Sequence, residues 1–271
     1  MSPLSSLRAT LTQIYPPKPT FTEAQIPPGL QRRRLGKILY AADATVYITS
    51  RPKDKVEAAI KAIKSTATNP TTSGTLKFLH LDLNDSTSRE SKLDILWNNA
   101  GTGANGVRPG QRTAQGFEPM IGFYCIATLL FTQVLVPLLR AAAADTSSVP
   151  GATRVVWTSS GVLNEPMVNY GASKAGTWFQ SRAFARRYKA DGIPVFAAYT
   201  ELFMGLSTDV KVEDTGAYVI PWGRIREDKA TPRHDLIRAG RALEERGLGY
   251  GEKLWEWCEE QWGCMCRDAH G

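Results

Sequence analysis

The chain has 271 residues, of which 42% are hydrophobic, so it can bury the core of one large α/β unit, and we expect a single domain over 1–271. The formal net charge is +7, but Lys and Arg are scattered among acidic residues without a basic stripe, which argues against nucleic acid as a partner. The 4 cysteines form no C-x-x-C pair and the 3 histidines stand apart from them, which argues against a metal site and indicates reduced thiols in a cytoplasmic protein.

The first half of the chain alternates strand and helix patterns after a proline-rich arm over 1–30, which predicts little regular structure. Apolar and β-branched runs predict strands, and 3.6-residue spacing predicts helices. The expected elements are a helix over Leu35 to Tyr40 and strands over Thr45 to Thr49, Leu76 to Leu83 and Leu93 to Trp97, with a helix over Lys53 to Lys64. This alternation indicates a mostly parallel sheet covered on both faces.

A long helix is predicted over 116–144, and its stretch from Met120 to Leu139 carries no charge. That stretch is long enough to cross a bilayer. It contains Pro137 and several polar residues, and Glu118 and Arg140 bracket it. We therefore favour a helix buried in a core or in a dimer or tetramer interface over a membrane span.

The second half continues with a strand over Arg154 to Thr158, a helix from Tyr170 to about Tyr188 and a strand over Pro194 to Ala198. After Ala198 the alternation breaks. We expect 199–271 to form loops, including Gly216 to Ile225, and one terminal amphipathic helix with a tryptophan-rich segment from Lys253 to Trp262.

Tyr170 and Lys174 are four residues apart on a predicted helix, so their side chains share one face. A phenol titrates near ~10, and a cation about 4 Å away favours its ionised form by about 4 kcal/mol at an effective dielectric near 20. Ser159 and Ser160 end the preceding strand, where ligands collect in open α/β sheets. The pattern Y-x-x-x-K also occurs by chance, and its position after a Ser-Ser strand end is what favours a catalytic role.

Three motifs in order resemble the short-chain dehydrogenase/reductase family: Asn98-Asn99-Ala100-Gly101 after one strand, Ser-Ser after the next, and Y-x-x-x-K on the following helix. The segments AYTELFMGLS and PWGRI are similar to one fungal branch of that family. The resemblance implies a Rossmann-like three-layer α/β/α fold with a mostly parallel sheet, and hydride transfer between NAD(P)H and a carbonyl or alcohol.

The resemblance also implies catalytic roles. Tyr170 would donate or accept the hydroxyl proton, and Lys174 would assist its ionisation and hold the nicotinamide ribose. Ser160 would position the substrate oxygen, with Ser159 as the less favoured choice.

Three further residues are implied in cofactor binding. Asp82 would contact the adenine and Asn99 the ribose region. Arg51 ends its strand where NAD-dependent members carry an acid, so it would favour the 2′-phosphate of NADP, with NAD as the alternative. The competing interpretation of Arg51 is a solvated loop residue.

The chain departs from the family where the diphosphate should bind. The first strand and its glycine-rich turn are missing, and the segment from Ile26 to Arg34 joins almost directly to the next helix. A literal G-x-G-x-x-G from Gly101 to Gly106 is rejected, because Pro109 and Gly110 follow it and no helix N-terminus faces the phosphates. Tyr124 also stands where the family has a catalytic asparagine.

The missing turn has a cost that can be bounded. Two or three charge-assisted hydrogen bonds, each about 1.5 to 3 kcal/mol, amount to roughly 3 to 9 kcal/mol, or about two to six decades of affinity. Arg32, Arg33 and Arg34 could compensate by meeting phosphate directly. Whole missing segments with matches on both sides indicate excised sequence, through an altered gene model, alternative splicing or gene decay.

Two functions remain in competition. One is an NADP-dependent oxidoreductase acting on a small-molecule carbonyl or alcohol, in fungal secondary metabolism. The other is a catalytically impaired relative that acts as a binding or oligomerising subunit. A third explanation is that the cell makes a different polypeptide. The sequence leaves the substrate, the direction of reaction and the number of subunits open.

Overall fold

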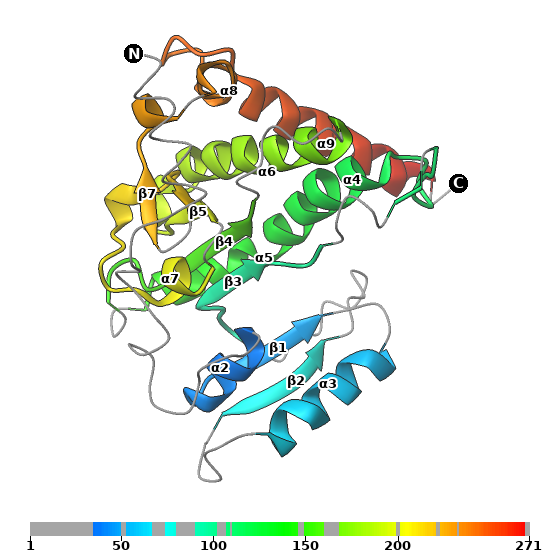
Figure 1. Ribbon diagram of the computed structural model, residues 1–271, viewed down its shortest axis with the longest axis vertical. Helices are drawn as coiled ribbons and strands as arrows, with labels where there is room; N and C mark the ends of the chain where they lie inside the picture. Colours follow the sequence, from blue (N-terminus) through cyan, green and yellow to red (C-terminus); the bar gives the residue numbers. More distant parts are fainter. Residues whose placement is uncertain are drawn as a thin grey trace. The chain divides into compact units, whose positions relative to one another are not determined.

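The structure is a computed structural model, and it describes residues 35–49, 53–66, 74–79, 90–101, 107–108, 110–145, 149–159, 168–198, 201–220, 223–231 and 233–268. The chain divides into two compact units, one over 20–89 and one that combines 1–19 with 90–271. Figure 1 labels the helices and strands of both units. The predicted arm over 1–30 lies outside the described residues, and the single domain over 1–271 stays a prediction.

The unit over 20–89 contains a pair of parallel strands contacted by two helices. The β-branched run Thr45–Thr49 forms β1, as its composition predicts, and Val46 pairs with Leu76. Its elements in chain order are α2 (Leu35–Ala41), β1 (Thr45–Thr49), α3 (Lys53–Ser65) and β2 (Thr75–Leu79). The predicted strand from Leu76 to Leu83 is thus described as far as Leu79, and 80–89 lie outside the described residues.

The second unit is built on a five-stranded sheet in the order β3-β4-β5-β6-β7. The first four strands are parallel, and β7 is antiparallel to β6. The strands are β3 (Ile95–Asn98), β4 (Arg154–Thr158), β5 (Val195–Ala198), β6 (Tyr218–Ile220) and β7 (Arg224–Arg226). All four residues of β5 and the first four of β4 are buried, which is typical of a parallel sheet covered on both faces.

Helices cover both faces of this sheet, giving three layers. Leu96 and Val155 point to the face where α5 (Thr128–Ala143) and α6 (Val168–Arg187) form the main core. Neighbouring strand residues point the opposite way. On that second face, Trp97 Nε1 donates to the Glu201 carbonyl at 3.1 Å, in the short helix α7 (Glu201–Leu206). The Rossmann-like three-layer fold is therefore present.

The predicted long helix runs continuously from Pro119 to Ala143, as α4 (Pro119–Ile121), a π-helical stretch η3 (Gly122–Ala127) and α5. Among the described residues, it is the segment long and apolar enough to span a membrane by length and composition. Leu129 and Leu139 are nevertheless fully buried in the core between α5, the sheet and α6. The packing is that of a core helix.

The prediction of loops from Gly216 to Ile225 is wrong. Tyr218–Ile220 forms β6, which pairs with β5, and Arg224–Arg226 forms β7, which extends the sheet further. The apolar triplet of β6 is buried against β5, and Gly223 adopts φ +70° in the turn between the strands. The rest of the chain after β5 contains η5 (Val212–Asp214), the turn η6 (Asp228–Ala230), α8 (His234–Gly240) and α9 (Tyr250–Asp268). The turn η4 (Lys189–Asp191) lies between α6 and β5.

The two sheets have the strand order of a doubly wound fold without its first strand. In such folds the order is 3-2-1-4-5-6, with strand 1 in the centre. When strand 1 is left out, the pair 3-2 is separated from a sheet that begins with strand 4. The described strands have this arrangement, with β2-β1 in one sheet and β3-β4-β5-β6-β7 in the other.

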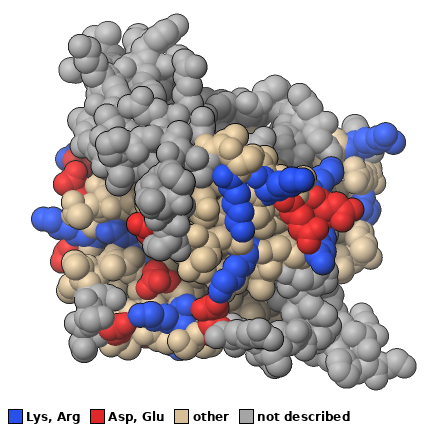
Figure 2. Space-filling model, turned by 90° about the horizontal axis from the view of Figure 1, so that it is seen from below, with Lys and Arg blue, Asp and Glu red and all other residues tan. Residues whose placement is uncertain are grey.

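Charged side chains of both signs lie next to one another on the face shown in Figure 2, over the residues drawn in colour. This agrees with their scattered distribution in the sequence. The absence of a nucleic-acid partner stays a prediction.

Candidate active site

Two adjacent parallel strands bring polar residues to one edge of the sheet. Asn98 of β3 pairs with Trp157 of β4, so the residues that follow them lie side by side. There, Thr158 Oγ1 donates a hydrogen bond to Asn99 Oδ1 at 3.0 Å. This is the carboxyl edge of the strands, where open α/β sheets bind their ligands.

Helix α6 places Tyr170 and Lys174 one turn apart at the same edge. Lys174 is 4% exposed, and its Nζ donates to the carbonyl oxygen of Thr158 at 3.1 Å. Tyr170 is half-buried. The lysine thus ties the first turns of α6 to the end of β4, and the two predicted catalytic side chains lie on the same side of the helix.

A second tyrosine completes the group. The Lys174 ammonium lies 3.7 Å from the ring centre of Tyr124 and 5.7 Å from that of Tyr170. The two rings are 6.1 Å apart, edge to face. We call Tyr124, Tyr170 and Lys174 the Tyr-Lys-Tyr cluster. Because a desolvated cation over an aromatic face gains about 2 kcal/mol, both rings help to hold a buried ammonium in place.

Local backbone features aim Tyr124 at the lysine. Tyr124 lies in the π-helical stretch η3, a rare geometry that occurs frequently at functional sites. Its hydroxyl packs against Gly101, where an added Cβ would lie 2.6 Å from the oxygen. Gly101 ends the Asn-Asn-Ala-Gly motif, so a glycine at this position allows the close approach.

Burial lowers the pKa of Lys174 from its usual 10.5 to about 8, with Cys125 and Glu201 acting weakly in the opposite direction. Burial likewise raises the pKa of the Cys125 thiol, which lies behind Lys174 on η3. Cys125 is therefore a neutral packing residue, and Lys174 is a cation close to its titration range at neutral pH.

The structure places the two predicted serines differently. Ser159 is buried, and its Oγ donates to the carbonyl oxygen of Lys174 at 3.3 Å, so this hydroxyl joins β4 to α6. Ser160, together with the predicted cofactor residues Arg51 and Asp82, lies outside the described residues.

Sequence reasoning placed Tyr170, Lys174 and Asn99 at this edge, and the structure brings them together there. It did not find Thr158, whose carbonyl and hydroxyl bind Lys174 and Asn99. It also noted Tyr124 only as a departure from the family. The signal in the sequence was that Tyr124 stands where the family has a catalytic asparagine, which does not by itself specify a contact with Lys174.

The cluster fits the ribose end of a nicotinamide cofactor. An ammonium has three N–H donors, and Lys174 uses one on Thr158 within the part of the chain that the structure describes. The remaining donors can bind ribose hydroxyls, and Asn99 lies beside them.

For metals the described residues offer no group of three or more His, Cys, Asp or Glu side chains.

Comparison with known proteins points to one family. The family model described as short chain dehydrogenase matches residues 33–213. The short-chain dehydrogenase/reductase iacJ of Pestalotiopsis fici is 37% identical over 334 aligned positions, which cover 96% of this chain and 99% of the relative. The short-chain dehydrogenase/reductase bet4 of Neocamarosporium betae is 32% identical over 334 positions, covering 96% and 93%.

The fold also has a solved counterpart. The crystal structure of the Sniffer protein of Caenorhabditis elegans superposes with a TM-score of 0.52 at 19% identity, covering 71% of this chain and 94% of that one.

The alignment with the iacJ relative is longer than this chain. It has 334 positions against a chain of 271 residues, so at least 63 positions of that relative have no counterpart here.

Proposed function

The chain belongs to the short-chain dehydrogenase/reductase family, and from this premise we propose that it is an NADP-dependent oxidoreductase acting on a small-molecule carbonyl or alcohol in fungal secondary metabolism. The observation that carries the proposal is the Tyr-Lys-Tyr cluster. An ammonium buried beside a half-buried phenol, at the carboxyl edge of the sheet, is an arrangement suited to moving a proton.

Tyr170 and Lys174 of the cluster have proposed parts in the reaction. Tyr170 gives the proton to the carbonyl oxygen or takes it from the alcohol. Lys174 places a positive charge beside the ring of Tyr170 and binds the ribose hydroxyls. A nicotinamide, when bound, supplies or accepts the hydride. We assign Ser160 to the substrate oxygen and Asn99 to the ribose.

The cofactor assignment is a proposal in two parts. Arg51 supports NADP over NAD, because a guanidinium pairs with a 2′-phosphate. Asp82 is assigned to the adenine. Both follow from family positions. A cytoplasmic location is proposed separately, from the cysteines that are expected to be reduced thiols.

Affinity for the cofactor is proposed to be low. The segment from Ile26 to Arg34 contains no glycine-rich turn, and the unmatched positions of the fungal relative support a loss of whole segments. We infer that the chain retains the groups for proton transfer and lacks the glycine-rich turn that binds the diphosphate.

The test compares the two tyrosines that flank Lys174. Tyr170→Phe should lower kcat/KM for carbonyl-dependent NADPH oxidation at least about 100-fold, the usual effect of removing a general acid. Tyr124→Phe keeps the ring under the ammonium and should stay within about fivefold of the wild type. Unchanged activity in Tyr170→Phe, or loss in Tyr124→Phe alone, would refute the assigned acid. A wild-type chain without any such activity would refute the proposed function.

A second candidate function, an oligomerising subunit, is favoured by one face of the long helix. Exposed apolar side chains recur on it at spacings of three and four, including Phe123 (37% exposed) and Val134 (52% exposed). Ala127, Pro137 and Ala141 are further exposed positions of this stripe, and Leu130, also on it, is half-buried. Such spacing gives the continuous apolar seam of packed helices.

Size-exclusion chromatography of the chain mixed with the iacJ relative tests this candidate. Co-elution is expected, and Val134→Glu should abolish it because a charge would then enter the seam. Val149→Glu is the matched control, since Val149 is 76% exposed and lies off the helix. Absence of co-elution, or equal loss in both variants, would contradict a subunit role.

A further inference from the structure

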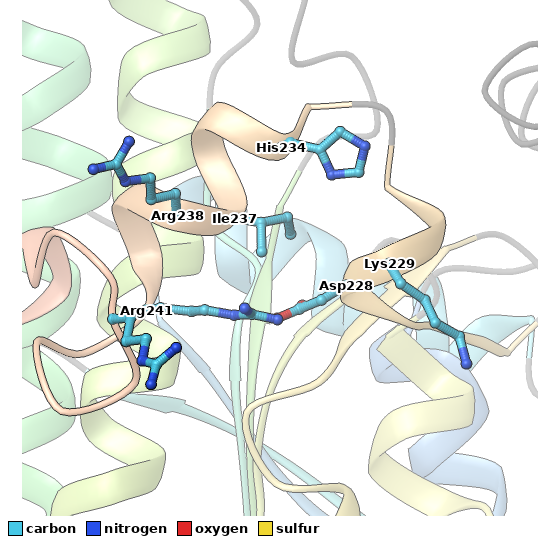
Figure 3. Close-up of a pocket in the computed structure, with 7 residues that line it drawn as sticks. Asp228, Lys229, His234, Ile237, Arg238 and Arg241 are labelled. Atoms are coloured by element: carbon cyan, nitrogen blue, oxygen red, sulfur yellow. The ribbon is translucent and has the colours of Figure 1, made fainter. Parts of the chain in front are cut away.

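A hollow of about 550 Å³ lies beside α8 and shares no residue with the Tyr-Lys-Tyr cluster. Its volume is in the range of small-ligand sites. Four of its lining residues are cationic: Lys229, Arg238, Arg241 and Arg246. Figure 3 shows α8 carrying part of this wall, with the Arg241 side chain extending toward Asp228.

The carboxylate that lines the hollow, that of Asp228, is already paired with cations. Asp228 accepts hydrogen bonds from Arg182 and, through Oδ2, from Nε and Nη2 of Arg241 at 3.2 and 3.1 Å. One carboxylate therefore faces two guanidinium groups. Lys229 pairs with Glu227 at 2.7 Å, outside the lining.

The two remaining arginines have no acidic partner within the described ranges. Arg238 and Arg246 are both exposed, and neither takes part in an ion pair there. Several other arginines of this unit are paired, as Arg140 is with Asp191 and Arg186 with Glu252. Two unpaired guanidinium groups on one hollow leave a positive field for an incoming anion.

A tight turn fixes the position of Arg246. Leu248 N donates to the Arg238 carbonyl at 2.8 Å, and Gly249 N to the Arg241 carbonyl at 2.9 Å, so the turn folds back on the end of α8. Arg246 adopts φ +59°, which is uncommon for a residue with a side chain. At Gly247 an added Cβ would lie 2.2 Å from the Arg241 carbonyl oxygen, so only glycine fits.

We propose that this hollow binds the phosphate group or groups of a phosphorylated small molecule. Guanidinium groups match phosphate oxygens through paired N–H donors, and such contacts are stronger than neutral hydrogen bonds. The concave shape suits a small ligand, and buried Ile237 gives it an apolar wall for the uncharged part.

Isothermal titration calorimetry of the full chain with inorganic pyrophosphate tests the proposal. The double variant Arg238→Ala/Arg246→Gly removes the unpaired cations, and glycine accepts the positive φ at 246 without strain. Each lost charge-assisted contact lowers affinity about tenfold, so the variant should bind roughly 100-fold more weakly. Circular dichroism should show the wild-type fold, since both side chains are exposed and unpaired.

The matched control is Arg108→Ala/Arg112→Ala, which removes the same charge from exposed positions that do not line the hollow. It should change pyrophosphate affinity less than about threefold, as expected for screened charges. An equal loss in both double variants, or none in the first, would overturn the proposal. So would a parallel loss of NADPH affinity in the first variant, because the hollow would then belong to the cofactor site.

Discussion

Lys174 decides the chemistry at the scale of single residues. Its ammonium is buried between Tyr124 and Tyr170 and has one backbone acceptor, Thr158. Burial costs the folded chain free energy as long as the amine stays charged. The lysine is therefore retained at the expense of stability, which is common for groups that serve a reaction.

The first prediction concerns Lys174→Met. Below pH 8 the lysine is charged in both folded and unfolded chains, so the substitution should stabilise the protein by up to about 3 kcal/mol. Between the lowered pKa of about 8 and the ordinary 10.5, the unfolded chain holds more protons than the folded one, and wild-type stability should rise with pH. Urea unfolding from pH 6 to 11 measures the free energy of unfolding of the wild type and of Lys174→Met. A difference between the two proteins that stays constant with pH would show that Lys174 is not desolvated.

At the scale of elements, the terminal helix α9 stabilises the core through one of its tryptophans. Trp255 is 2% exposed and packs on Phe184 of α6, with ring centres 5.7 Å apart. Its Nε1 donates to Glu259 at 2.7 Å. Trp257, two residues along, is 38% exposed and touches Phe117 edge to face.

Trp255→Ala should lower the free energy of unfolding by about 3 to 5 kcal/mol, because it removes a fully buried ring from a packed core. Trp257→Ala is the control from the same helix and should cost at most about 1 kcal/mol. Thermal or urea unfolding of the two variants makes the comparison. Similar losses in both would mean that α9 does not pack on α6 as described.

Sequence patterns predicted the strands and helices whose own residues determine their secondary structure. The apolar strand Arg154–Thr158 and the helix that follows it have nearly the expected bounds, since burial on both sides fixes their composition. The hairpin of β6 and β7 was missed because its strands have three residues each and depend on pairing, β6 with β5 and β7 with β6. The contact of Tyr124 with Lys174 was missed because it depends on a π-helical turn and on tertiary contacts such as that with Gly101.

At the scale of the whole molecule, the strands that the structure describes form two separate sheets. The two sheets β2-β1 and β3-β4-β5-β6-β7 match a doubly wound order without strand 1. In that family the turn after strand 1 binds the diphosphate at a helix N-terminus. The proposed loss of strand 1 would therefore affect both the sheet and the binding of the cofactor.

Equilibrium titration of NADPH by fluorescence, against this chain and an intact relative with the glycine-rich turn, tests the central claim most directly. We predict a Kd at least about 100-fold weaker for this chain, since two or more charge-assisted hydrogen bonds to the diphosphate are missing. A Kd equal to that of the intact relative would contradict the claim that the diphosphate-binding turn has been lost.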